Sequence, residues 1–137
     1  MAKMVIGLSS GSIDKLVGAG VIMSGAAADD MDIEVYVLLT AARAFLKGNE
    51  ELQDSLVEYP HIQDEFFARM KELNLPTWIE SFKQVKEFTN LKIYICSLAG
   101  KMWGGESLDQ FNDLVDDFSG IFQYIDAAQN ADLHINI

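Results

Sequence analysis

The chain has 137 residues, half of them apolar, which is enough for one hydrophobic core and too few for two. Its formal net charge of −11 makes nucleic acid and anionic membranes poor partners, because both attract proteins chiefly through Lys and Arg. The single cysteine excludes an intramolecular disulfide, and no stretch approaches the ~20 apolar residues of a membrane helix or resembles a signal peptide, so we expect a cytoplasmic protein.

The first half of the chain predicts a β-α-β-α order. Met4–Leu8 is a short continuous apolar run, typical of a strand buried on both faces. A helix is expected over 13–29, and its many small residues indicate a backbone that lies close to the sheet or to a neighbouring subunit. The β-branched run 33–39 predicts the second strand, and 40–47 a short helix closed by Gly48. This alternation is typical of a parallel sheet.

The middle segment, 49–90, is expected to be a helical insertion within the same domain, because it is too short to bury a core of its own. A capping box begins at Thr77, directly after Pro76, and predicts a helix start there. Two apolar stripes have helical spacing: Ile62, Phe66, Met70 and Leu73 form the first, and Trp78, Phe82, Val85 and Thr89 form the second.

The third strand is expected at Leu91–Cys96, with a loop or short helix over 97–102. Ser107 opens a second capping box, which predicts a helix that reaches Val115. The side chains expected to point inward from this helix are Leu108, Phe111, Leu114 and Val115.

The C-terminal segment completes the pattern with a brief strand at 116–118 and an alternating edge strand at 133–137. Between them an amphipathic helix carries Phe118, Ile121, Phe122, Ile125 and Ala128. The sequence therefore predicts a single-domain, doubly wound α/β fold over 1–137. Its sheet should be mainly parallel, with at most five strands, helices on both faces, and Met4–Leu8 and Leu91–Cys96 central.

Two loops at the carboxyl ends of these strands form the candidate site, because open parallel sheets bind ligands at that edge. Cys96 ends the third strand, and the N–H groups of a helix starting there would favour its thiolate form. Lys15 and Lys101 are candidate positive neighbours for that thiolate. The candidate rim residues are Ser9, Ser10, Gly11, Ser12, Asp14, Lys15, Ser97, Lys101, Trp103 and Gly104.

Other chemistries lack their motifs. His61 and His134 stand far apart, with no further ligand at zinc spacing, so no metal is expected. The chain has no Gly-x-Ser-x-Gly elbow, no Gly-x-Gly-x-x-Gly and no Gly-Lys-Ser/Thr, so no hydrolase or nucleotide signature applies and no cofactor is expected. The hydroxyl-rich loop Ser9–Ser12 leaves phosphate or nucleotide binding open as an alternative.

The order of these blocks resembles the DsrE/DsrF-like family of small sulfur-relay proteins. Ile6–Lys15 resembles that family's strand, Ser/Gly turn and Asp-Lys helix start, and Lys92–Cys96 with Met102–Gly104 resembles its cysteine loop. Gly25–Ala28 and the tail from Gly120 to Leu133 continue the resemblance, which spans roughly 3–48 and 91–137. Trp103 departs from the Met that is usual in the branch it most resembles.

The resemblance implies a doubly wound fold, assembly into homo-oligomers, and a cysteine that carries sulfur as a persulfide or thiosulfonate; on that pattern Cys96 is the carrier. With no second cysteine, sulfur would pass to a partner protein or a small thiol. The alternative, from a different class, is a non-catalytic oligomeric binding or scaffold protein with an inert, buried Cys96.

Overall fold

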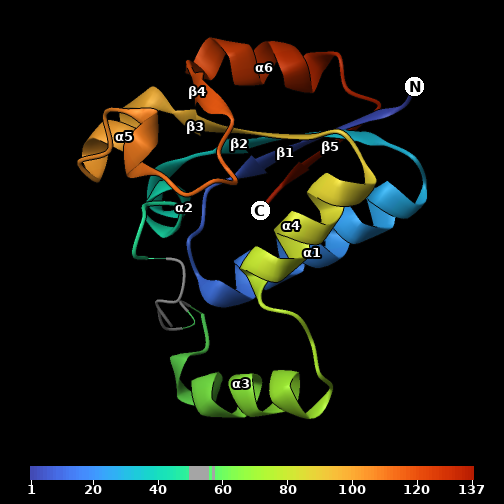
Figure 1. Ribbon diagram of the computed structural model, residues 1–137, viewed down its shortest axis with the longest axis vertical. Helices are drawn as coiled ribbons and strands as arrows, with labels where there is room; N and C mark the ends of the chain where they lie inside the picture. The colour runs from blue at the N-terminus through green and yellow to red at the C-terminus, as the bar shows by residue number, and fades with distance from the viewer. Residues whose placement is uncertain (50–55, 57) are drawn as a thin grey trace.

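The computed structural model describes residues 1–49, 56 and 58–137, so part of the predicted 49–90 segment lies outside the described residues. The described residues form a five-stranded, all-parallel sheet in the order β4-β3-β2-β1-β5 (Figure 1). The strands are β1 (Lys3–Leu8), β2 (Asp32–Val37), β3 (Leu91–Cys96), β4 (Asp117–Ser119) and β5 (Leu133–Asn136). The predicted α/β class is confirmed. Of the two strands expected to be central, β1 and β3 are both interior, but β2 occupies the middle.

One face of the sheet is apolar and is covered by two helices that lie side by side, α1 (Ile13–Ala28) and α4 (Trp78–Phe88) (Figure 1). Ile6 of β1 stands beside Val35 of β2 in the parallel register and is fully buried. A Cβ on Gly20 would lie only 2.8 Å from the Cβ of Ser81, so a small residue of α1 permits the close approach of α4. The small residues of this helix predicted a close approach to the sheet or to a neighbouring subunit, and at Gly20 the close approach is made to α4.

The opposite face of the sheet is covered by α6 (Ile121–Gln129), which lies above it in Figure 1. This face is aromatic and polar. The ring of Tyr36 lies between those of Tyr94 and Tyr124, and its centroid is 5.3 Å from the centroid of each. Tyr124 is the residue that α6 buries. The apolar stripe that predicted this helix is mostly outside, since Ile121, Phe122 and Ile125 are all exposed.

The helix predicted to run from Ser107 to Val115 is wrong. The capping box of Ser107 and Gln110 is present, but it closes only a three-residue 3-10 turn, η2 (Leu108–Gln110). Beyond it Phe111 adopts an extended backbone and forms an antiparallel bridge with Leu46, and Asn112 N–H donates to the carbonyl of Phe45 at 2.9 Å. Pairing with a distant segment overrides the local helical signal, although Phe111 and Leu114 are buried as expected.

The described part of the middle segment contains two α-helices, which differ in how much they bury against the rest of the protein. α4 begins where predicted, with Glu80 N–H donating to the hydroxyl of Thr77 at 3.2 Å, and it buries Trp78, Phe82 and Val85 in the core. A 3-10 turn, η1 (Pro60–Ile62), precedes α3 (Gln63–Glu72), which buries no residue and projects from the body of the molecule (Figure 1). Of these two helices, α4 alone joins α1 in the layer that covers the sheet.

The remaining helices are α2 (Leu39–Ala44) and α5 (Ser97–Met102), and both follow strands directly. The expected loop or short helix after Cys96 is thus a helix. The other expected boundaries differ from the observed ones by up to three residues, and most of them by one or two, which is the usual fraying of element ends. Within the described residues, no helix has the length and hydropathy needed to cross a bilayer.

Candidate functional site

Cys96 lies at the junction of β3 and α5. Its backbone is still extended (φ −60°, ψ 125°), and it is the N-cap of α5, so the strand leads directly into the helix. On its other side it is paired in register with Ser119 of β4. The residue is only 8% exposed and packs within the hydrophobic core. The sequence placed this cysteine correctly at the carboxyl edge, and the structure adds that it is almost covered.

The serine hydroxyls of the loop after β1 form hydrogen bonds with other groups of the protein. The hydroxyl of Ser9 donates to the carbonyl of Ile137 at 3.1 Å, and the hydroxyl of Ser10 accepts the N–H of Ser12 at 3.2 Å. The hydroxyl of Ser12, which is buried, donates to the carboxylate of Asp14. These three hydroxyls are therefore engaged with protein groups, and a phosphate would have to compete with those bonds.

The start of α2, which the sequence did not single out, joins the two predicted loops. Gly11 N–H donates to the hydroxyl of Thr40 at 3.0 Å, and that hydroxyl donates to the carbonyl of Ser9 at 3.1 Å. A Cβ on Gly11 would lie 2.5 Å from the Thr40 carbonyl oxygen, so glycine is required at this approach. From the other loop, the indole N–H of Trp103 donates to the carbonyl of Leu39 at 3.0 Å.

Leu39 has a left-handed backbone, with φ +45°, which is unusual for a residue with a branched side chain. This conformation turns the chain from β2 into α2 and presents the Leu39 carbonyl to Trp103. The bridge follows from the strand order. Because β2 lies between β1 and β3, its loop lies between theirs, and the sequence carries no signal of that order.

The loops after β1 and β3 lie at the same edge of the sheet, but they are not neighbours there. One strand separates them, and two strand spacings amount to about 10 Å. Lys15 instead forms an exposed ion pair with Glu58 at 3.5 Å, and Lys101 is exposed in the last turn of α5. Among the described residues, neither lysine has an ion pair or hydrogen bond with Cys96.

The loop after α5 is fastened to its surroundings. Gly104 takes up a left-handed φ of +79°, and its carbonyl accepts the side-chain N–H of Gln110 at 3.0 Å. The guanidinium of Arg43 lies 5.9 Å from the ring centre of Trp103. Ser97 is tied to the neighbouring strand by its hydroxyl, which donates to the carbonyl of Ser119 at 3.4 Å. Ser97, Trp103 and Gly104 therefore belong to one ordered rim beside Cys96.

Apolar side chains are exposed on the segments that leave this edge of the sheet. Leu98 and Met102 of α5 and Ile121 and Phe122 of α6 all face solvent, as does Leu39. We call these five residues the apolar rim.

The three tyrosines of the aromatic face beneath α6 have raised pKa values. Burial first, and then the hydrogen bond from its hydroxyl to the Glu34 carboxylate at 2.8 Å, raise the pKa of Tyr36. Burial likewise raises the pKa of Tyr94 and of Tyr124. These phenols stay neutral at physiological pH, and those of Tyr36 and Tyr124 donate to Glu34 and Asn136. In the described part of the chain, no three His, Cys, Asp or Glu side chains are grouped as a metal site would need.

Comparison with known proteins establishes the fold and goes no further. No family model matches the chain, and no curated protein matches its sequence. The structure resembles the crystal structure of the YchN protein from E. coli, with a TM-score of 0.63 and 15% sequence identity, over the whole of both chains. At this identity the similarity supports the doubly wound α/β fold of the whole chain.

Proposed function

We propose that the chain is a cytoplasmic sulfur carrier or sulfurtransferase-like protein of the DsrE/DsrF-like family, with Cys96 as the sulfur-bearing residue. The observation that carries the proposal is the position of Cys96, at the carboxyl end of β3 and at the first turn of α5. Ligand sites of parallel sheets form at this edge, and backbone N–H groups at a helix start favour a thiolate. The sequence resemblance and the shared fold type support the same function.

The proposed chemistry is a pair of thiol exchange steps. The Cys96 thiolate attacks the outer sulfur of a persulfide donor, a new S–S bond forms, and the donor leaves as its thiolate. The acceptor thiolate then attacks the outer sulfur of the Cys96 persulfide, which releases Cys96 as a thiolate again. No net oxidation occurs. The added sulfur extends the side chain by about 2 Å, which would carry the reactive atom outward from a nearly buried position.

The partner of this exchange has to be another molecule, because the chain holds no second cysteine. We propose that donor and acceptor thiols approach across Leu39, Leu98 and Met102 of the apolar rim, on the helices that follow β2 and β3, which leaves its α6 residues for assembly. We further propose a homo-oligomer in which Ile121, Phe122 and Ile125 of α6 meet a second copy, since these side chains are exposed on a helix whose inner face is already packed.

The experiment is mass spectrometry of the native protein after exposure to thiosulfate, tetrathionate or polysulfide. We expect polysulfide and thiosulfate to add sulfur as a persulfide, with sulfite released from thiosulfate, and tetrathionate to add a thiosulfonate group with release of thiosulfate. Small thiols should remove each adduct. Cys96→Ser should abolish loading and keep the fold, because the replacement is nearly isosteric. Ser24→Ala, on an exposed position of α1 outside the candidate site, is the control, which should load normally. No added mass with any donor would contradict the proposal.

A second candidate is favoured by one observation, the 8% exposure of Cys96 within the core. In this case the protein is a non-catalytic binding or scaffold protein, and the thiol is packing. Alkylation distinguishes the two functions. A carrier thiol reacts with iodoacetamide in the native protein near neutral pH, whereas an inert one reacts only after unfolding.

A further inference from the structure

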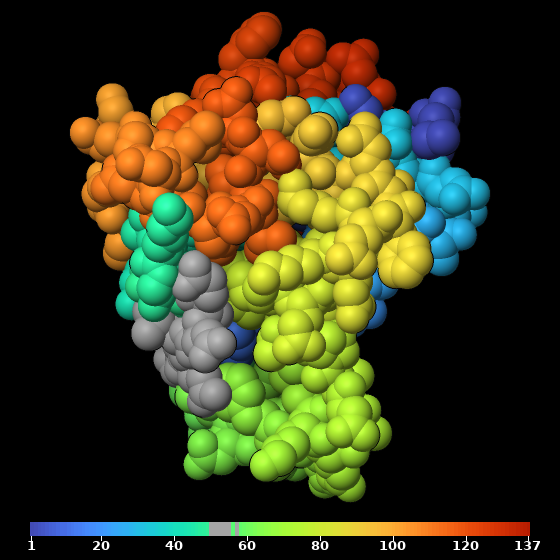
Figure 2. All heavy atoms as spheres, in the orientation of Figure 1, coloured from blue at the N-terminus to red at the C-terminus, as the bar shows by residue number. Residues whose placement is uncertain are grey.

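A cleft of about 1030 Å³ opens between α3 and the layer of α1 and α4, and Cys96 is not part of it. In Figure 2 blue atoms from the start of α1 are visible at the bottom of a gap between α4 and α3. Its volume is at the upper end of the range of small-molecule sites. The apolar wall comes from three helices and comprises Ile13, Val17, Phe67, Met70, Trp78 and Ile79.

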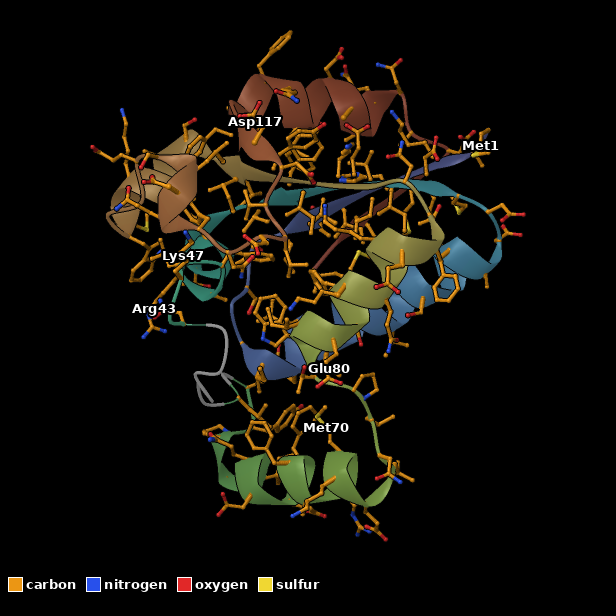
Figure 3. The ribbon with its side chains drawn as sticks, viewed as in Figure 1. Met1, Arg43, Lys47, Met70, Glu80 and Asp117 are labelled. Atoms are coloured by element: carbon orange, nitrogen blue, oxygen red, sulfur yellow. The ribbon has the colours of Figure 1, made fainter. Side chains whose placement is uncertain are left out.

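The cleft exists because α3 does not close onto the body. Phe66 and Phe67 of α3 are only partly buried against the core, and the side chain of Met70 rises from α3 toward the first turn of α4, where Glu80 lies (Figure 3). The opposing wall, formed by α4, is well packed, since Trp78 makes edge-to-face contacts with Phe45 and Phe82. The space between is apolar on both sides, which favours an apolar occupant.

Cationic side chains line the cleft in an otherwise acidic molecule. Lys47, Lys71 and Lys83 are three of the ten Lys and Arg residues of the chain, and within the described residues none of them has an ion pair. Two carboxylates, Glu80 and Asp113, line the same cleft. The lining therefore has a small positive excess, which suits a monoanion better than a dianion.

A buried donor without a partner lies in the same wall. The Oδ1 of Asn112 accepts the N–H of Leu114 at 3.0 Å, and this bond fixes the orientation of the amide. Its Nδ2 is covered and has no hydrogen-bond partner among the described residues. A buried donor of this kind is costly unless an acceptor satisfies it.

We propose that this cleft binds a small amphipathic carboxylate, an apolar chain or ring system that bears one carboxylate group. The apolar body lies between Met70 of α3 and Trp78 of α4. The carboxylate is held by the lysines that line the cleft, and a small movement of the wall on binding would let one of its oxygens accept from Nδ2 of Asn112, which is covered in the free protein. The site is independent of Cys96 and of any sulfur chemistry there.

Decanoate is the test ligand, and Trp78 reports its binding. The chain has two tryptophans, so Trp103→Phe leaves Trp78 as the single fluorophore in the otherwise complete protein. We expect a saturable change in Trp78 emission and one binding event per chain by calorimetry. Decanol, which lacks the charge, should bind about tenfold more weakly, and decyltrimethylammonium more weakly still.

Matched substitutions locate the site. Met70→Glu puts a negative charge on the α3 wall and should weaken decanoate binding by about tenfold or more, whereas Ala68→Glu, on an exposed position of the same helix outside the cleft, should not. Since α3 buries no residue, neither change threatens the fold. Lys83→Gln should weaken binding about threefold, and Lys92→Gln, outside the cleft, should leave it unchanged.

The proposal would be overturned by no binding of decanoate, by equal binding of decanoate and decanol, or by equal effects of Met70→Glu and Ala68→Glu. A change in sedimentation with Met70→Glu, in place of a change in decanoate affinity, would make the cleft an interface between copies and the proposal wrong. Cys96→Ser should bind decanoate normally. Failure of sulfur loading and failure of decanoate binding are therefore separate outcomes.

Discussion

At the scale of single residues, the tightest constraint on the aromatic face is the missing side chain of Gly7. A Cβ there would lie 2.2 Å from the hydroxyl oxygen of Tyr124 and 2.5 Å from the side-chain oxygen of Asn136. Tyr124 donates to that oxygen at 2.6 Å and lies 2.7 Å from Nε2 of His134. The hydroxyl of Tyr124 therefore connects Asn136 and His134. One glycine thus makes room for a connected polar group under α6.

We expect Gly7→Ala to destabilise the protein by about 1–3 kcal/mol, because the added methyl overpacks a site where backbone and Tyr124 cannot both stay in place. The matched control is Gly18→Ala, which adds the same methyl group at another glycine. A Cβ at Gly18 meets nothing within 4 Å, and alanine should stabilise α1 by about 0.5–1 kcal/mol. Urea unfolding measures both. Equal effects of the two substitutions would show that the close approach at Gly7 is not limiting.

At the scale of elements, α6 has two unlike faces. The face toward the sheet is built around Tyr124 with partly buried alanines, and the face away from it carries Ile121, Phe122 and Ile125. The helical period was therefore readable in the sequence, but its direction was not. The larger apolar stripe ordinarily marks the core side, and here the sheet beneath the helix offers tyrosines and polar groups in place of an aliphatic surface.

The proposed assembly through α6 predicts that Phe122→Glu gives a monomer by light scattering at micromolar concentration. Phe122 is 80% exposed, so the substitution should leave the free energy of unfolding of the subunit within about 0.5 kcal/mol. Gln129→Glu adds the same charge to the same helix without removing an apolar side chain, and it should stay assembled. A wild-type protein that is monomeric under these conditions would contradict the assembly.

At the scale of the whole molecule, the sequence revealed the strands and the position of Cys96 more reliably than the relations between distant segments. The run from Leu91 to Cys96 was predicted without error because its apolar residues Leu91, Ile93 and Ile95 alternate, as in a strand with one face on the core. The failures came from long-range pairing. The bridge between Leu46 and Phe111 ended an expected helix, and the strand order placed Leu39 and Thr40 between the two predicted loops. Neither pairing has a local signature in the chain.

The weak attachment of α3 has a consequence for how the molecule opens. A helix that buries no residue shares little of its free energy with the sheet, so it forms a separate cooperative unit of low stability. Amide exchange should show this directly: the N–H groups of α3 should exchange through a local opening that depends little on urea. Those of β1 to β3 should exchange only by global unfolding, and decanoate should slow the exchange of α3 alone. Uniform exchange would contradict the division. If it holds, a guest molecule enters by displacing ten residues while the remaining architecture, including the cysteine edge, stays folded.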